Sequence, residues 1–207
     1  MSQYSLVLDV DDTGLRRLSK TRARIIVAKP SGTSKPNVAW LANEPSETTT
    51  IRWDEAYGLY AAHVPVRDCA QIAIVAAVHP AEDCVIYPFA GTAFGDPVTD
   101  GRIPRRHYDV RNDDRRPATF GLLQHATIND LAVGAPLNAV VLPPGLTADF
   151  AAVTTLYVWT QAGLEAGSII SHVPADAAVV TFDPVHRARR CRFDDRTGTF
   201  AKTGGEP

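Results

Sequence analysis

The chain has 207 residues, of which 45% are hydrophobic, so it is long enough to bury a substantial core. Its 21 Lys and Arg residues against 23 Asp and Glu give a net charge of -2, which provides no electrostatic reason to expect a nucleic acid partner. The longest apolar stretch, Ile72 to Val78, is far shorter than the roughly 20 residues that span a bilayer, so we expect no membrane span.

The N-terminal sequence MSQYSLVLDV lacks the basic region, long apolar stretch and small-residue cleavage site of a secretory signal. The three cysteines, Cys69, Cys84 and Cys191, form no C-x-x-C pair and are poor material for a disulfide framework. We therefore expect a cytoplasmic protein.

Short segments rich in apolar and β-branched residues recur along the chain, separated by Gly, Pro, Asn and Asp. They predict strands at Tyr4–Val10, Ala23–Lys29, Asn37–Leu41, Thr48–Trp53, Tyr57–Val64, Ala70–Val78, Cys84–Phe89, Thr119–Ile128, Asn138–Leu142, Ala152–Thr160, Ser168–Val173, Ala177–Phe182, Arg190–Phe193 and Thr199–Lys202. QIAIVAAV and TTLYVWT are apolar on both faces, which is typical of central strands covered on both sides.

Helical signals are sparse. GLRRLSKTRA predicts a short helix with Asp12 or Thr13 as its N-cap. The segment from Gly91 to Ala118 is rich in Gly, Pro, Asp and Arg and predicts a long loop, which we expect at the mouth of any pocket.

These patterns predict an all-β fold, a single-domain β-sandwich of Greek-key or jelly-roll type over residues 1–202, with a flexible tail at 203–207. FGLLQHATIND, APLNAVVLPPG and LYVWTQAGLEAGSII resemble small uncharacterised all-β proteins of fungi and soil bacteria. The resemblance starts near Val38 and implies a β-rich globular fold, but it implies no activity.

Polar aromatic residues are concentrated in TTTIRWDEAYGLYAA, which holds Trp53, Tyr57 and Tyr60. A continuous strand would place Trp53, Glu55 and Tyr57 on one face, leaving Glu55 as a carboxylate that needs a partner such as an arginine, or a cavity. A turn at residues 54–56 would instead expose Glu55. We favour the turn.

The first functional hypothesis is a binding module for a small hydrophobic molecule or a glycan, because aromatic faces with a few convergent polar groups line such pockets. Its candidate ligand-binding residues are Trp53, Glu55, Tyr57, Tyr60, Arg105, Arg106 and Trp159.

An enzyme is the alternative. His107 and Asp109 form an H-x-D pair, and His172 or His186 lies downstream, with Arg196 ten residues after His186. In order and spacing, His107, Asp109 and His186 resemble the metal ligands of iron and 2-oxoglutarate oxygenases, which implies Fe(II) and 2-oxoglutarate as cofactors.

Two further alternatives remain open from the sequence. One is a metal-free pocket enzyme, for which the sequence indicates no candidate nucleophile. The other is a structural protein that forms homo-oligomers by pairing apolar strand edges.

Overall fold

The structure is a computed structural model that describes residues 3–63 and 66–203. Within these ranges the chain folds into strands β1 to β18 and the single helix α1, which confirms the all-β class. Val64, the end of one predicted strand, and residues 204–207 of the predicted tail lie outside the described residues.

The largest sheet has nine strands, and its continuous order is β18-β17-β1-β4-β11-β5-β6, with β12 and β13 also paired to β11. Its strands are β1 (Tyr4–Asp9), β4 (Thr48–Trp53), β5 (Tyr57–Ala62), β6 (Ile74–Val78), β11 (Ala118–Ile128), β12 (Leu131–Pro136), β13 (Val140–Leu142), β17 (Ala188–Asp194) and β18 (Thr199–Lys202).

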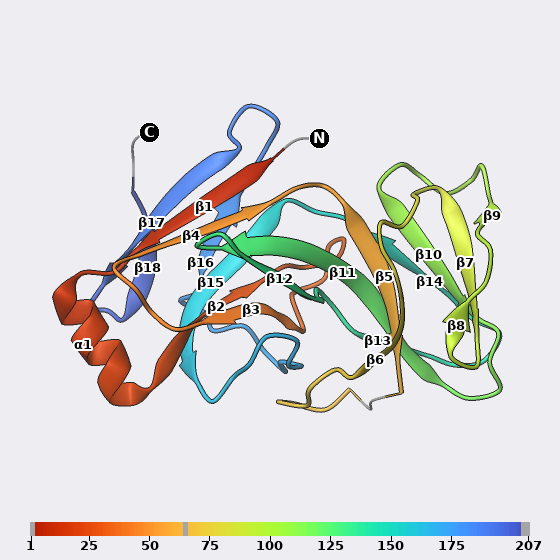
Figure 1. The fold of residues 1–207 in the computed structure, drawn as a ribbon, viewed down its shortest axis with the longest axis horizontal. Coiled ribbons are helices and arrows are strands. Elements are labelled where there is room, and N and C mark those ends of the chain that lie inside the picture. Colours follow the sequence, from red (N-terminus) through yellow and green to blue (C-terminus); the bar gives the residue numbers. More distant parts are fainter. Residues whose placement is uncertain (1–2, 64–65, 204–207) are drawn as a thin grey trace.

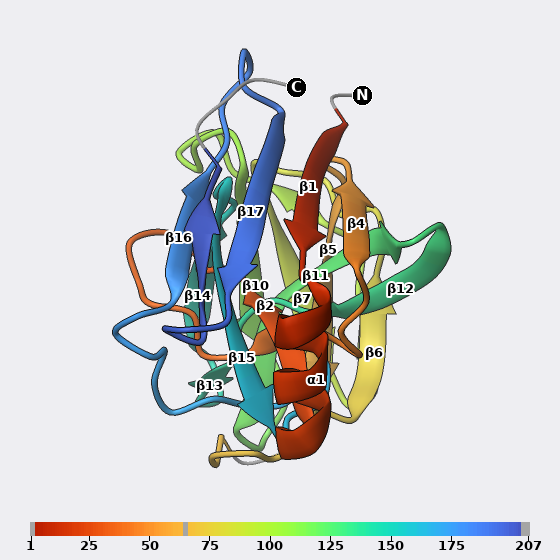
Figure 2. The ribbon, with the colours of Figure 1, turned by 90° about the vertical axis from the view of Figure 1, so that its left-hand side faces the viewer.

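Two smaller sheets complete the fold. The five-stranded sheet has the order β14-β10-β7-β8, with β9 paired to β7, and the four-stranded sheet has the order β16-β15-β2-β3. The strands are β7 (Val85–Ala90), β8 (Ala93–Phe94), β9 (Val98–Thr99), β10 (His107–Asn112) and β14 (Thr147–Ala151) in the former, and β2 (Ala23–Ala28), β3 (Ala39–Asn43), β15 (Thr155–Ala162) and β16 (Ala178–Thr181) in the latter. The five-stranded sheet and helix α1 (Asp12–Thr21) lie at opposite ends of the molecule (Figures 1 and 2). The strands thus form three hydrogen-bonded sheets, and the Greek-key or jelly-roll type remains a prediction.

One hydrophobic cluster joins all three sheets. It includes Leu122 of the nine-stranded sheet, Val110 of the five-stranded sheet and Ile25 of the four-stranded sheet, and none of the three side chains is exposed. Full burial of a Val, Leu or Ile side chain contributes roughly 1.5–3 kcal/mol. Apolar side chains from all three sheets therefore pack into one shared core.

The predicted helix forms, with its N-cap one or two residues before the predicted Asp12 or Thr13. Asp11 is the N-cap and accepts a 2.9 Å hydrogen bond from the Gly14 amide, while the last turn ends at Arg22 with φ of 51°. Gly14 is required because an added Cβ would lie 2.8 Å from Phe193 Cδ1.

The prediction of a long loop between Gly91 and Ala118 is wrong. This segment contains β10, an interior strand of the five-stranded sheet. Tyr108, Val110 and Asn112 are buried and alternate with half-buried polar residues. The high Arg and Asp content of the segment hides this alternation in the sequence.

Two other strand predictions also differ from the structure. The QIAIVAAV segment, expected at the centre of a sheet, forms the edge strand β6, where Ile74 is 41% exposed. The predicted strand Ser168–Val173 makes only isolated bridges, including Val38 to Ile169. Apolar composition alone does not distinguish an edge strand from a central one.

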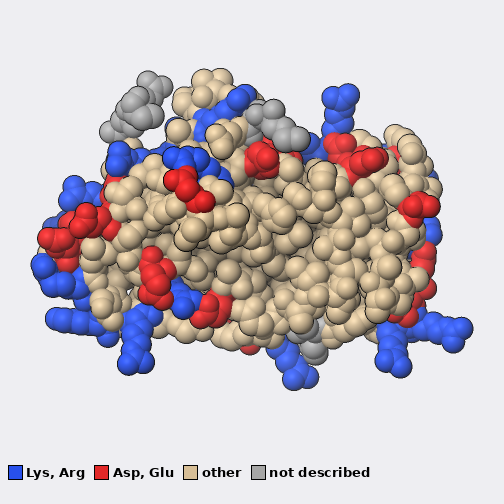
Figure 3. Space-filling model, in the orientation of Figure 1, with Lys and Arg blue, Asp and Glu red and all other residues tan. Residues whose placement is uncertain are grey.

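Charged side chains lie mainly around the rim of the face shown in Figure 3, and the centre of that face, over β11 and β5, carries few of them. Several arginines are paired with nearby acids: Arg111 Nε lies 2.7 Å from Asp113 Oδ1, and Arg190 Nη2 lies 3.0 Å from Asp9 Oδ1. Among the helices of the described residues, none is long and apolar enough to cross a membrane.

Candidate functional site

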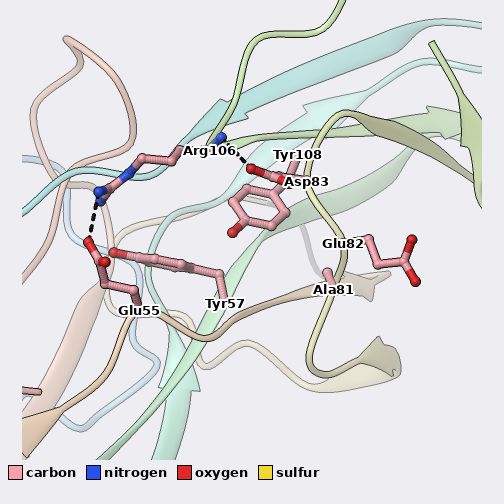
Figure 4. Close-up of a pocket in the computed structure, with 7 residues that line it drawn as sticks. All are labelled: Glu55, Tyr57, Ala81, Glu82, Asp83, Arg106 and Tyr108. Atoms are coloured by element: carbon pink, nitrogen blue, oxygen red, sulfur yellow. Dashed lines mark hydrogen bonds and ion pairs between the residues drawn. The ribbon is translucent and has the colours of Figure 1, made fainter. Parts of the chain in front are cut away.

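A pocket of about 480 Å³ opens where the β4–β5 turn, the β6–β7 loop and the start of β10 meet (Figure 4). We call it the Glu55–Arg106 pocket, after the ion pair across it. Its lining residues are Glu55, Tyr57, Ala81, Glu82, Asp83, Arg106 and Tyr108.

The turn predicted at residues 54–56 is confirmed: β4 ends at Trp53 and β5 begins at Tyr57, with a bend at Glu55. The Ala56 amide donates a 3.0 Å hydrogen bond to Asp54 Oδ1, the local bond by which Asp favours turns. Because the chain bends here, Glu55 leaves the strand face and its side chain remains 33% exposed.

Glu55 has two partners from distant parts of the chain. Arg106 Nη1 lies 2.7 Å from Glu55 Oε1, and Tyr4 Oη donates a 3.1 Å hydrogen bond to the same oxygen. Burial, followed by the charge of Glu55, raises the pKa of Tyr4. Glu55 therefore has an arginine partner even though it lies in a turn, whereas the sequence required such a partner only on a continuous strand.

Arg106 is held by its own backbone. Its amide donates a 2.7 Å hydrogen bond to Asp83 Oδ2, and its carbonyl accepts one of 3.0 Å from the Ala152 amide. Its φ is 64°, a left-handed conformation that costs a non-glycine residue about 1–2 kcal/mol. These contacts offset that strain and direct the side chain across the pocket toward Glu55 (Figure 4).

Tyr57 and Tyr108 form the floor of the pocket, with ring centroids 5.8 Å apart and ring planes at 47°. Both are almost fully buried, at 2% and 6% exposed. Burial raises the pKa of Tyr108 to about 12 and raises that of Tyr57 further. Both phenols are therefore neutral near pH 7 and can donate or accept a hydrogen bond.

Lys29 lies behind this floor and is 0% exposed. Its Nζ donates 2.8 Å hydrogen bonds to Tyr57 Oη and to Gln124 Oε1. Burial, followed by the positive charge of Arg106, lowers the pKa of Lys29 to about 7, and Glu55 acts in the opposite direction.

Lys29 is a functional candidate that the sequence hypotheses missed. A signal was present, because strand periodicity places Lys29 on the same face as Ile25 and Val27, both core residues. A lysine at the end of an apolar strand would ordinarily be assigned to the surface, since lysine is almost never fully buried without a partner.

Of the sequence-predicted ligand residues, Glu55, Tyr57 and Arg106 meet at the pocket. Trp53 lies in the core and stacks on Tyr4 at 5.7 Å between centroids, outside the pocket lining. The remaining predicted residues lie elsewhere, as follows. Tyr60 is buried in a second cluster and donates to the Asn138 carbonyl, Trp159 is buried in a third cluster beside Gln161, and Arg105 does not line the pocket.

The two histidines among the candidate metal ligands pair with other acids. His107 Nδ1 lies 2.8 Å from Asp149 Oδ1, and His186 Nδ1 lies 2.9 Å from Asp183 Oδ2. Asp109 sits opposite Asp149 in the β10–β14 pairing, and its pKa is raised to about 6 by burial and then by the charge of Asp149.

Across residues 3–63 and 66–203, no group of three His, Cys, Asp or Glu side chains is arranged to hold a metal ion. The described residues therefore do not assemble the ligand set expected from His107, Asp109 and His186.

Comparison with protein-family models, with curated proteins and with solved structures gave no match to this chain.

Proposed function

We propose that the chain is a binding module for a neutral, hydroxyl-rich ligand, a sugar or short glycan, and that the Glu55–Arg106 pocket is its site. The observation that carries this proposal is an ion pair between two segments distant in the chain, set across a cavity whose floor is two neutral tyrosines. The cavity volume of about 480 Å³ lies within the range typical of small-molecule sites.

The polar groups of the pocket suit hydroxyl recognition. A sugar hydroxyl is both a donor and an acceptor, so it can donate to a carboxylate and accept from a guanidinium. Glu55, Asp83 and Arg106 supply those groups within one pocket. Hydrogen bonds to charged groups each contribute about 1.5–3 kcal/mol, so a few of them give useful affinity and selectivity.

The charge balance of the lining favours a neutral ligand over an anionic one. The lining holds three acidic residues, Glu55, Glu82 and Asp83, and one cation, Arg106, which already pairs with Glu55. An anion would have to break that ion pair and approach two further carboxylates. A purely hydrophobic ligand is also disfavoured, because it would desolvate charged groups without replacing their hydrogen bonds.

The test is a glycan array probed with labelled wild-type protein, with Arg106→Ala and with Arg105→Ala. Arg105 is the matched control, because it adjoins Arg106 in sequence but does not line the pocket. We expect wild type and Arg105→Ala to bind the same neutral glycans and Arg106→Ala to lose them. Binding by all three proteins alike, or by none, would count against the pocket as a sugar site.

A second candidate function is self-association, favoured by the exposed edge strand β6. Ile74 and Val75 are 41% and 40% exposed on this strand, which pairs on one side with β5. Unpaired strand edges with apolar side chains pair readily with another chain. Light scattering over a wide concentration range tests this, and a constant monomer mass would exclude it.

A further inference from the structure

Lys29 lies in a cage of aromatic rings contributed by β3 of the four-stranded sheet and by β4 and β5 of the nine-stranded sheet. Its Nζ is 5.7 Å from the Trp40 ring centroid, 5.9 Å from that of Trp53 and 4.8 Å from that of Tyr57. Isolated burial of an ammonium group is expensive, so a lysine in such a place normally loses its proton more easily than one in water.

The hydrogen bonds around Lys29 match a neutral amine. Its Nζ donates to Tyr57 Oη and Gln124 Oε1, both at 2.8 Å, and Tyr57 Oη donates in turn to the Val153 carbonyl at 3.3 Å. A neutral amine has two N–H groups, and an ammonium has three. Within the described residues these are the two hydrogen bonds that Nζ makes, so the third N–H of an ammonium would face the aromatic rings, whose cation–π attraction offsets only part of the cost of burying the charge.

Both acceptors of Lys29 lead to the pocket. Tyr57 is part of its floor, and Gln124 Nε2 donates a 2.7 Å hydrogen bond to the Asp54 carbonyl. That carbonyl belongs to the turn that directs Glu55. The backbone of Gln124 is also held, because Trp40 Nε1 donates a 3.1 Å hydrogen bond to its main-chain carbonyl. The amine is therefore connected to Tyr57 by one hydrogen bond and to the turn at residues 54–56 by two in series.

We propose that Lys29 is a proton-responsive positioning residue of the Glu55–Arg106 pocket. As a neutral amine it donates to the Tyr57 hydroxyl and, through Gln124, supports the turn at residues 54–56. Uptake of a proton keeps both donors but places a positive charge without a carboxylate partner among the described residues, and this buried charge acts on both contacts. This regulation rests on the proposed function for its biological meaning, but the protonation itself can be measured without any ligand.

The charged groups that influence the pKa of Lys29 belong to the pocket. Trp40, Trp53 and Gln124 carry no charge, and Tyr57 stays neutral because burial raises its pKa. The charges that act on Lys29 are Arg106, which lowers its pKa, and Glu55, which raises it. Electrostatic coupling of this kind is reciprocal. A proton taken up by Lys29 therefore also changes the electrostatic interactions that Arg106 and Glu55 can make with a ligand.

The experiment is an NMR titration of protein labelled with ¹³C at lysine Cε. The chain has only four lysines, Lys20, Lys29, Lys35 and Lys202, so the spectrum is simple. We expect one signal to titrate near 7, well below the value near 10.4 of a lysine in a model peptide. Lys29→Met assigns that signal, and if this variant does not fold, Lys→Arg substitutions at the other three positions assign it by elimination.

Three variants test the coupling to the pocket. Arg106→Gln should raise the pKa of Lys29, Glu55→Gln should lower it, and Arg105→Gln, the matched control, should leave it unchanged. A Lys29 signal that titrates above about 9, or one that ignores both Arg106→Gln and Glu55→Gln, overturns the proposal. If Lys29 responds as expected and no sugar binds, the proton response stands and only the proposed function fails.

Discussion

Glu55 and Arg106 form a 2.7 Å ion pair across a pocket, although 51 residues separate them in the chain. Each is directed by its own backbone: Glu55 by the turn that breaks the strand between β4 and β5, and Arg106 by the bond from its amide to Asp83. Surface ion pairs contribute little stability, with a median near 0–1 kcal/mol. The turn at Glu55 and the hydrogen bond from the Arg106 amide to Asp83 direct this pair into the cavity. Ligand binding explains this arrangement better than a contribution to protein stability does.

Tyr108→Phe should weaken ligand binding by roughly three- to tenfold, because the variant keeps the pocket floor but removes one hydrogen-bonding hydroxyl. The ring is 6% exposed, so its packing and the unfolding free energy should change by less than about 1 kcal/mol. Isothermal titration with the best array ligand measures the affinity. Tyr157→Phe is the control, because Tyr157 lies on β15 and does not line the pocket; equal affinities for the two variants would exclude a role for the Tyr108 hydroxyl.

Deprotonation of Lys29 should make the unfolding free energy depend on pH. Its pKa is lowered to about 7 in the folded protein, so the unfolded chain binds more protons between pH 7 and about 10. The unfolding free energy must therefore rise with pH across this window, by up to about 5 kcal/mol from this group alone.

Urea denaturation of wild type and Lys29→Met at pH 6.5, 7.5 and 8.5 measures this contribution. Wild type should gain stability with rising pH relative to the variant, because the variant has no amine to deprotonate. Other titrating groups, such as the thiol of Cys191, whose pKa burial raises to about 11, contribute equally to both proteins. Parallel pH profiles would mean that Lys29 keeps an ordinary pKa.

The sequence predicts the local features of the site but not its assembly. The turn at residues 54–56 follows from a carboxylate that would be misplaced on a strand face, and Asp11 and Gly14 produce a helix close to the expected one. These features depend on neighbouring residues. Tyr108 was missed because β10 alternates polar and apolar residues inside a segment dominated by Arg and Asp.

Lys29 and the edge position of β6 could not be predicted for a different reason. Whether a strand lies at a sheet edge, and which residues close over its end, depends on pairing between strands far apart in the sequence. Gln124 and Tyr57, the two acceptors of Lys29, lie 95 and 28 residues away from it. No periodicity within β2 carries that information.

His125→Gln should raise the pKa of His79. The two imidazole rings lie 4.1 Å apart at 31°, beside the loop that supplies Ala81, Glu82 and Asp83 to the pocket. Burial, followed by the charge of His125, lowers the pKa of His79. The unfolded state therefore takes up protons first as the pH falls through 6.5, and the protein loses stability on acidification.

NMR titration of the histidine Cε1 protons measures this effect, with His186→Gln as the control because His186 pairs with Asp183 elsewhere. The His125→Gln variant should also lose less stability than wild type between pH 7 and pH 5. An unchanged His79 titration in His125→Gln would show that the two rings are not electrostatically coupled.

Gly121→Ala should destabilise the protein by about 3 kcal/mol or more, since overpacking against a rigid backbone has no cheap relaxation. An added Cβ would lie 1.9 Å from the Asn138 carbonyl oxygen and 2.8 Å from Tyr60 Cε1. Gly101→Ala is the matched control, because a Cβ there meets no atom within 4 Å. Thermal unfolding of both variants checks this, and equal melting temperatures would mean that β11 and the Asn138 segment are not packed as described.

The most direct measurement is an isothermal titration of the strongest neutral glycan from the array against wild type, Arg106→Ala and Arg105→Ala. Arg106→Ala should weaken binding by about tenfold or more, as expected for loss of a charged hydrogen-bond donor, and Arg105→Ala should stay within about twofold of wild type. The same dissociation constant for all three proteins, or no heat of binding with any of them, would contradict a sugar site between Glu55 and Arg106.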